Sequence, residues 1–343
     1  ETVVKKAMKI ASYIGGHWHL GEGKGYQCHD PASGDVVASL PRAGIDVAAA
    51  FQHARAVGCK TLAATTFHQR AGMLKDIAKS ISARKDELYE ISLSTGASKA
   101  DGIVDIDGGL GTLFVYGSRG TNELPNAKVL TDGQVENLSK DGSFVAQHIY
   151  APRQGVALQI NAFNFPVWGL LEKFAPAFLA GVPVVIKPAG QTAFLSAALV
   201  RMITEVTQLP EGSLQLISDV AHEALDHIGS QDVIAFTGSQ QTARTISSHP
   251  SVLEHNPRMS FETDSLNATV LGPEVSIDDE EAALFIAEIK KELVSKSGQK
   301  CTAIRRVFVQ EAIADQLEKA LVDQCAGVVI GNPRHHDVQM GPL

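Results

Sequence analysis

The alternation of strand-like and helix-like segments between residues 155 and 248 constrains the fold more than any other feature. Short apolar runs are followed repeatedly by longer segments that carry apolar residues at helical spacing. This pattern predicts an α/β fold built on a parallel, doubly wound sheet. The expected strands are 155–160, 182–186, 214–217 and 232–236, and the expected helices are 167–180, 192–207, 222–228 and one that begins at Gln240.

Polar residues follow these strands, at the ends where a parallel sheet binds its ligands. Asn161 to Asn164 follow the first strand, Lys187 follows the second, and Thr237 to Ser239 follow the last. A lysine and a helix N-terminus both suit ribose and phosphate groups. Taken singly, each of these residues could equally be ordinary surface.

The N-terminal region has a different pattern. Its first 125 or so residues are expected to be mainly helical, with helices over 47–56 and 67–93. The glycine-rich stretch from Gly21 to Gly25 resembles a phosphate loop, but it does not lie between a strand and a helix. We interpret it as a turn.

Two further units flank the alternating region. Residues 143–150 alternate as a half-exposed strand after a turn signal, which predicts a projecting hairpin, and exposed strands of this kind need a partner. We therefore expect a homo-oligomer, with a homodimer as the default. Beyond Glu262, Asp278 is expected to cap a helix that ends near Gly298, directly before Cys301.

Composition excludes several classes of function. The 343 residues are 44% apolar, enough for more than one domain, and the net charge of −8 argues against nucleic acid and anionic membranes as partners. The four cysteines are widely spaced, which predicts no disulfide framework and no metal site. Charged residues and prolines interrupt the most apolar region, 156–186, so no membrane span is expected. We expect a soluble cytoplasmic protein.

Three residues have the chemistry of a catalytic site. Cys301 follows a glycine and sits beside Lys300, a cation that would favour the thiolate, although an inert cysteine is an equal alternative. Asn164 could stabilise an oxyanion, a role worth roughly 10²- to 10³-fold in rate, or it could simply cap a helix. Glu262 could act as a general base on water, or be a solvated residue at a strand end.

The order and surroundings of these residues resemble the aldehyde dehydrogenase superfamily, over essentially the whole chain. The motifs that carry the resemblance are Asn164-Phe165-Pro166, Lys187-Pro188-Ala189, Phe236-Thr237-Gly238-Ser239, Glu262 and Gly298-Gln299-Lys300-Cys301-Thr302. Further stretches resemble the CoA-linked semialdehyde dehydrogenases of aerobic aromatic degradation, namely those of the phenylacetate ring-opening and benzoyl-CoA pathways. These stretches are 104–109, 160–166, 264–267 and 297–306.

The resemblance implies NAD(P)-dependent oxidation of an aldehyde to an acid. Cys301 would be the nucleophile, Asn164 the oxyanion donor and Glu262 the base that releases the acid from a Cys301 thioester. The resemblance implies a cofactor site at Ile160, Asn161, Phe163, Lys187, Ala189, Gly190, Thr237, Gly238 and Ser239. It also implies a dinucleotide-binding domain at 1–128 and 152–262, an oligomerisation arm at 129–151 and a catalytic domain at 263–343.

The sequence departs from the family at three places. Gly190 replaces a glutamate that grips the adenosine ribose in many NAD-preferring members, so we expect NADP to be preferred and NAD to be weaker. Ala243 replaces a glycine on the phosphate side. Family members also continue well past Leu343, so the resemblance implies that the catalytic domain is incomplete in this chain.

Other functions remain compatible with the sequence. An acylating relative would pass the thioester to CoA, but such enzymes generally lack the base that Glu262 would provide. A general semialdehyde dehydrogenase, a non-enzymatic binding protein and a cofactor-binding fragment without turnover are further alternatives.

Overall fold

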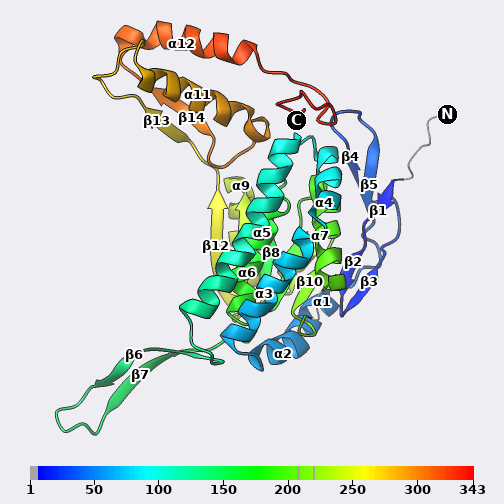
Figure 1. Ribbon diagram of the computed structural model, residues 1–343. Helices are drawn as coiled ribbons and strands as arrows, with labels where there is room; N and C mark the ends of the chain where they lie inside the picture. Colours follow the sequence, from blue (N-terminus) through cyan, green and yellow to red (C-terminus); the bar gives the residue numbers. More distant parts are fainter. Residues whose placement is uncertain (1–6, 207–208, 219–220) are drawn as a thin grey trace.

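A seven-stranded sheet forms the centre of the protein in the computed structural model, which describes residues 7–206, 209–218 and 221–343 (Figure 1). Its strands lie in the order β12-β11-β8-β9-β10-β2-β3. Their bounds are Arg258–Thr263, Val233–Gly238, Ala157–Ile160, Val184–Lys187, Leu214–Leu216, Ser12–Ile14 and His17–His19.

Strands β8 to β12 are parallel to one another. At one edge of the sheet, β2 pairs antiparallel with β10, and β3 pairs antiparallel with β2. From β8 the chain builds outward through β9 and β10, then crosses back to β11 on the other side of β8. This reversal confirms the predicted doubly wound sheet, and it places the topological switch point, where such sheets bind ligands, between the carboxyl ends of β8 and β11.

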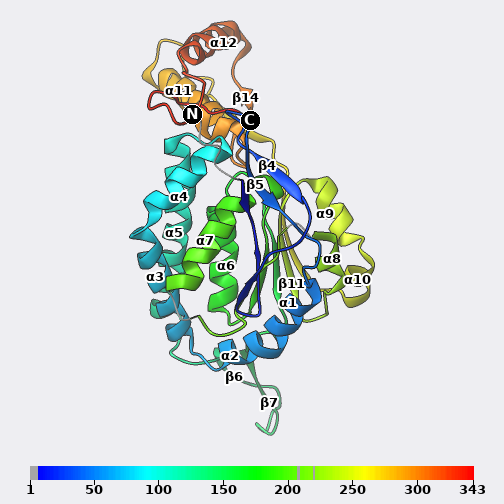
Figure 2. The same cartoon turned by 90° about the vertical axis from the view of Figure 1, so that its right-hand side faces the viewer.

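Helices cover both faces of this sheet (Figure 2). Each face has its own buried apolar core, one around Phe174 and Phe178 and the other around Phe51 and Phe236. On the first face lie α3 (Phe67–Ser82), α4 (Lys85–Ser92), α5 (Lys99–Asn122), α6 (Trp168–Leu179) and α7 (Ala193–Val206). On the second lie α1 (Val47–His53), α8 (Ala221–Asp226), α9 (Gln240–Ser247) and α10 (Pro250–His255).

The prediction of a mainly helical N-terminal region is wrong for residues 8–40. This part of the chain contains β2, β3 and a separate three-stranded sheet of β1 (Met8–Lys9), β5 (Val36–Leu40) and β4 (Tyr26–His29). These strands are two to five residues long. Runs this short give too few periods to separate a strand from a loop by pattern.

The helix predictions for the N-terminal region also need correction. In place of the predicted helix 47–56 the chain forms α1, a π-helical turn η1 (Ala54–Gly58) and α2 (Cys59–Ala63). In place of the predicted helix 67–93 it forms α3, α4 and the beginning of a 3₁₀ turn η2 (Leu93–Thr95). The 24-residue helix α5 lies in the region expected to be mainly helical, but its bounds were not predicted. Its glycines disfavour a helix by propensity, so tertiary packing decides its formation.

The alternating region agrees closely with its prediction, with a short 3₁₀ turn η3 (Gly190–Thr192) before α7. The predicted helix 192–207 is α7, although its last residue, Thr207, lies outside the described residues. Among the described residues, no helix is long and apolar enough to cross a membrane.

Two smaller units extend from the central body (Figure 1). A hairpin of β6 (Leu130–Asn137) and β7 (Val145–Tyr150) projects from one end, as the sequence predicts. At the other end lie a parallel pair of strands and two helices. They are β13 (Asn267–Val270), β14 (Ile304–Phe308), α11 (Glu280–Val294) with the 3₁₀ turn η4 (Ser295–Gly298), and α12 (Glu311–Ala326). The N-cap of α11 is Asp279, one residue after the predicted Asp278, and the helix ends before Gly298.

Candidate active site

Cys301 lies directly after the turn that ends α11. Lys296, Ser297 and Gly298 have φ angles of 53°, 54° and 70°, so the chain reverses sharply before the cysteine. The side chains of Ser265 and Asn267 both donate hydrogen bonds to the Cys301 carbonyl oxygen. These contacts fix the cysteine backbone where the β13–β14 unit meets the central sheet.

The thiol of Cys301 is protonated more readily than an ordinary cysteine. The residue is exposed, yet desolvation of its thiol is the first cause that raises the pKa, and the hydrogen bond and negative charge of Glu262 raise the pKa further. Lys300 does not supply the neighbouring cation that the sequence suggested. Its ammonium lies 2.7 Å from a carboxylate oxygen of Glu292, and both side chains are largely buried.

Glu262 lies on edge strand β12, and its position in the sheet pairs it with Thr237 of β11. The Thr237 hydroxyl donates to a Glu262 carboxylate oxygen at 3.3 Å. Glu262 also lines a pocket of about 410 Å³ between the sheet and helices α5 and α6. The other lining residues are Thr112, Tyr116, Trp168, Glu172, Lys173, Ala235, Phe236, Thr237, Ser260 and Phe261.

Asn164 lies in the loop between β8 and α6. Its side-chain amide donates a hydrogen bond of 2.8 Å to the carbonyl oxygen of Gln299, two residues before Cys301. The structure therefore brings together a thiol, a carboxylate and an amide donor that are far apart in the sequence. This arrangement can support attack on a carbonyl, because it has a nucleophile, a base and a donor for the developing oxyanion.

The other predicted residues gather at the carboxyl ends of β8, β9 and β11. Ile160 pairs with Lys187 across β8 and β9. Asn161 is 5% exposed, and neither polar atom of its side chain has a hydrogen-bond partner among the residues that the structure describes. Ser239 is the N-cap of α9 and accepts a hydrogen bond from the Thr242 N–H.

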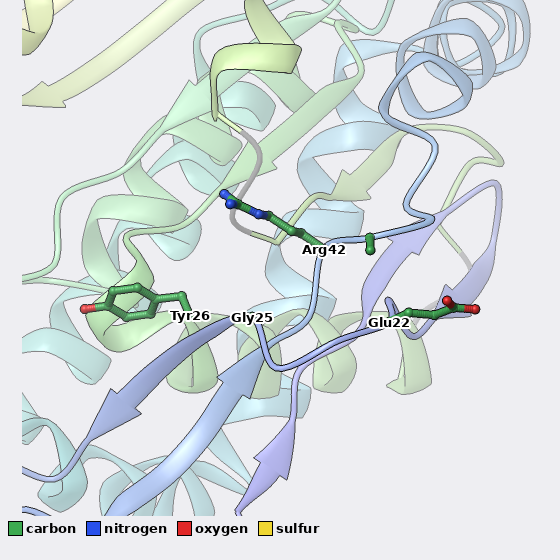
Figure 3. A pocket seen from close by; sticks show the side chains of 5 residues that line it. Glu22, Gly25, Tyr26 and Arg42 are labelled. Carbon is green, nitrogen blue, oxygen red and sulfur yellow. The ribbon is translucent and has the colours of Figure 1, made fainter.

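Gly190 lies against the ring of Tyr26. A Cβ atom at Gly190 would lie 3.3 Å from two ring carbons of Tyr26. Tyr26 also lines a pocket of about 450 Å³, together with Glu22, Gly25, Arg42 and Ala43. Figure 3 shows Glu22 and Tyr26 pointing in opposite directions, with the Arg42 side chain between them. Within the described ranges Arg42 forms no ion pair.

Comparison with known proteins identifies the family. The family model described as "Aldehyde dehydrogenase family" matches residues 18–343. The chain belongs to the aldehyde dehydrogenase family.

Two curated relatives of this aldehyde dehydrogenase chain are named as semialdehyde dehydrogenases. The 3,4-dehydroadipyl-CoA semialdehyde dehydrogenase of Aromatoleum evansii is 41% identical over 337 residues, which cover 98% of this chain and 65% of the relative. The malonate-semialdehyde dehydrogenase of Bacillus pumilus (strain SAFR-032) is 27% identical, over 97% of this chain and 66% of the relative. The chain thus spans slightly less than two thirds of both relatives.

The fold also matches solved structures of the family. A putative aldehyde dehydrogenase from Burkholderia cenocepacia superposes with a TM-score of 0.85 at 25% identity, over 98% of this chain and 66% of that chain. The parallel sheet whose strand order reverses between β8 and β11 is therefore the aldehyde dehydrogenase fold.

The residues at the carboxyl ends of β8, β9 and β11 fit a nicotinamide dinucleotide. The buried amide of Asn161 needs a polar partner, and the half-buried Lys187 offers an ammonium at the end of β9. In the first turn of α9 the Gln240 N–H donates to the Asp264 carboxylate at 3.1 Å and the Thr242 N–H to the Ser239 hydroxyl, so a phosphate there would replace these acceptors. A ligand with both hydroxyl and phosphate groups matches this set of donors.

Sequence reasoning missed several residues that organise the site. Ser265 and Asn267 belong to a stretch that carried the family resemblance, but their sequence gave no reason to expect contact with Cys301. Asp101 and Asp105 hold the loops beside the site. Asp105 belongs to the 104–109 stretch that carried the family resemblance, but neither residue gave a reason to expect these contacts. Their roles depend on contacts across 60 or more residues, which no local pattern encodes.

Proposed function

We propose that this aldehyde dehydrogenase oxidises a CoA-linked semialdehyde, formed by ring opening of an aromatic compound, to the carboxylic acid with NADP. The observation that carries the proposal is that Cys301, Glu262 and Asn164 lie close together. The Asn164 amide donates a hydrogen bond to the carbonyl oxygen of Gln299, which directly precedes Lys300 and Cys301. Those residue types are the ones that covalent oxidation of an aldehyde requires.

Glu262 hydrogen-bonds the thiol and takes its proton as the sulfur attacks the aldehyde carbon. The new C–S bond leaves an alkoxide, which accepts hydrogen bonds from the Asn164 amide and the Cys301 backbone N–H. A bound nicotinamide supplies the acceptor for the hydride, which leaves a thioester on Cys301. Glu262 releases the thiol proton to bulk water and then takes a proton from the water molecule that attacks the thioester. The acid leaves as the C–S bond breaks, and the proton on Glu262 returns to the sulfur and restores the thiol.

The substrate class rests on the relatives. The relative with 41% identity is named for a CoA-linked semialdehyde, and the one with 27% identity for a simple semialdehyde. The difference in identity favours the CoA-linked class, with the phenylacetate and benzoyl-CoA routes as candidate sources. A general semialdehyde substrate is the second candidate.

The preference for NADP rests on Gly190 and its surroundings. Gly190 presents no carboxylate to repel a 2′-phosphate, and Arg42 is among the residues that line the neighbouring pocket beside Tyr26. A guanidinium without an acidic partner is well suited to a phosphate. In this proposal Asn161 and Lys187 hold ribose hydroxyls, while Thr237, Gly238 and Ser239 border the phosphates.

The assembly and compartment belong to the same proposal. The projecting β6–β7 hairpin exposes apolar side chains, which a second copy of the chain would cover in a homodimer. We place the reaction in the reducing cytoplasm, where the exposed Cys301 remains a thiol.

The first test is reduction of NADP with a CoA-linked semialdehyde, followed by the absorbance of the reduced nicotinamide. Wild type and Cys301→Ser are compared, with Cys325→Ser as the matched control because Cys325 lies on α12, away from the site. Activity that disappears only in Cys301→Ser supports the proposal. Equal activity in both cysteine variants, or product that forms only with free CoA present, contradicts it.

A further inference from the structure

Helix α5 carries two buried carboxylates one helical turn apart, and a buried lysine faces them. Asp101 is 4% exposed, Asp105 is 1% exposed and Lys296 is 7% exposed. Charged side chains are rarely buried unless they are paired, because the loss of hydration is costly. The position of this cluster beside the site calls for an explanation.

Asp105 holds the N-terminus of α6. Its two carboxylate oxygens accept the N–H groups of Trp168 at 2.8 Å and Val167 at 3.3 Å. Val167 is the N-cap residue, and its apolar side chain offers no acceptor, so α5 provides the cap from outside. Asn164 lies only three residues before Val167, and its backbone is therefore anchored by Asp105.

Asp101 holds the turn that leads to Cys301. One of its oxygens accepts the Lys296 backbone N–H at 2.8 Å, and the other accepts the Ser98 hydroxyl at 2.7 Å. Lys296 and Ser297 have left-handed backbones, which cost about 1 kcal/mol or more each for residues with a Cβ. The bond from Asp101 stabilises this turn.

Lys296 connects the two halves of the cluster. Its ammonium interacts with the charges of both Asp105 and Asp101, and it lies 5.1 Å from the centre of the Phe165 ring. Phe165 directly follows Asn164. A residue of the cysteine segment thus packs on a residue of the asparagine loop, beneath the hydrogen bond between Asn164 and Gln299.

We propose that Asp101, Asp105 and Lys296 are positioning residues that set the separation between the Asn164 amide and the Cys301 thiol. Helix α5 acts as the common support, since its carboxylates hold the backbone of both loops. The inference rests on the proposed roles of Asn164 and Cys301, but the mechanical coupling between the loops does not depend on the identity of the aldehyde.

The decisive comparison separates positioning from stability. In Lys296→Met the two buried carboxylates lose their cation, whereas in Asp105→Asn/Lys296→Met one of the two negative charges is removed as well and burial becomes less costly. We expect the double variant to regain most of the thermal stability that the single variant loses, while kcat stays about tenfold or more below wild type. Misplacement of a reacting group by about 1 Å is enough for such a loss.

Three readouts accompany kcat, namely the melting temperature, the dissociation constant of NADPH, and the rate at which iodoacetamide alkylates Cys301. The NADPH constant is expected to change less than about twofold, because the cluster lies away from Asn161 and Lys187. Asp107→Asn is the control, since Asp107 lies on the same helix but bonds to Lys85 and Tyr89. It should keep the wild-type kcat.

Recovery of kcat together with stability in the double variant would overturn the inference, as would a loss of NADPH binding equal to the loss of kcat. Alkylation of Cys301 needs no turnover. The alkylation rate of Asp101→Ala therefore tests the positioning role even if the proposed aldehyde oxidation is wrong. If positioning is correct, Asp101→Ala changes the Cys301 alkylation rate at least threefold even in a chain that oxidises no aldehyde. An unchanged rate contradicts it.

Discussion

At the scale of single residues, Glu262 influences the charge of the Cys301 thiol. Desolvation and the hydrogen bond that the thiol donates to Glu262 keep the pKa of the thiol above its ordinary value. The resting cysteine is therefore a protonated thiol at neutral pH, and nucleophilic attack requires transfer of its proton to a base. A carboxylate in direct contact is the acceptor that the structure provides.

Glu262→Gln should lower the pKa of Cys301, because a neutral amide removes the negative charge that opposes the thiolate. Alkylation of Cys301 by iodoacetamide, followed by peptide mass spectrometry across pH, should therefore reach half its maximal rate at lower pH than in wild type. Glu292→Gln is the control, since Glu292 pairs with Lys300. A midpoint that moves to higher pH, or does not move, would show that Glu262 does not act on the thiol.

Gly190 should decide between the two dinucleotides. Gly190→Glu introduces a carboxylate that repels a 2′-phosphate, so the ratio of kcat/KM for NADP to that for NAD should fall at least tenfold. Gly190→Ala is the matched control, because its Cβ already makes the 3.3 Å contacts with Tyr26 without adding charge. If Gly190→Ala shifts the ratio as much as Gly190→Glu, crowding against Tyr26 and not charge determines the preference.

At the scale of elements, α5 shows how packing overrides propensity. Its glycines lie where other helices approach closely. A Cβ at Gly108 would lie 2.2 Å from the Trp168 ring, and one at Gly120 would lie 2.8 Å from Leu179. Glycine lowers the intrinsic stability of the helix, but it permits the close contact of α5 with α3 and α6. That contact also brings Asp101 and Asp105 to the site.

Gly108→Ala should lower the free energy of unfolding by about 2–3 kcal/mol, because Trp168 has to move to accept the new methyl group. Gly111→Ala on the same helix should stabilise the protein by up to about 1 kcal/mol, since its Cβ would meet nothing within 4 Å. Chemical denaturation of both variants measures the difference. Equal effects of the two substitutions would mean that α5 does not pack on α6 as described.

The buried cap of α6 predicts a particular dependence of stability on pH. Burial raises the pKa of Asp105 to about 6, above its value of about 4 in an unfolded chain. Between these values the native state retains a proton that the unfolded state has released, so the contribution of Asp105 to stability falls as pH rises from about 4 to about 6. Above pH 6 this contribution no longer changes.

The side chain in Asp105→Asn does not titrate. As pH rises from about 4 to about 6, the unfolding free energy of wild type should therefore fall relative to that of this variant. The total change should not exceed about 3 kcal/mol, given 1.36 kcal/mol per pKa unit. Denaturation at several pH values between 4 and 7 measures it. A difference that grows in favour of wild type as pH rises would mean that the carboxyl is ionised more readily in the folded protein.

At the scale of the whole molecule, the hairpin is the part for which we propose a partner. Its two strands contact each other along their length but expose large apolar side chains, and an isolated hairpin is marginally stable in water. The exposed apolar residues on it are Val135, Leu138, Phe144, Val145, Ile149 and Tyr150.

Ile149→Asp should weaken the proposed homodimer at least tenfold, because it places a charge in the apolar contact. Sedimentation velocity across a range of protein concentrations measures the effect. Lys140→Asp is the control, since it adds negative charge at the hairpin turn without removing an apolar side chain. A wild-type protein that remains monomeric at every concentration would exclude the hairpin as an assembly arm.

The sequence predicted different parts of the molecule to different degrees. Strands β8 to β11 and helices α6 to α9 follow their apolar patterns to within a few residues, because each is buried in a repeating environment. The strands β1 to β5 were not predicted because they are too short to show a period. The motifs around Cys301, Glu262 and Asn164 were visible in the sequence, whereas the contacts of Ser265, Asn267 and Asp105 were not.

The sequence by itself determined the parallel α/β sheet, the family and the chemical types at the candidate site. These features depend on local periodicity and on short motifs, both of which can be recognised in the sequence alone. The tertiary structure alone decided that Lys300 faces Glu292 instead of Cys301, that Glu262 contacts the thiol, and that α5 supports both loops. The physical reason is that pKa, burial and hydrogen bonding depend on neighbours in space, and those neighbours come from distant parts of the chain.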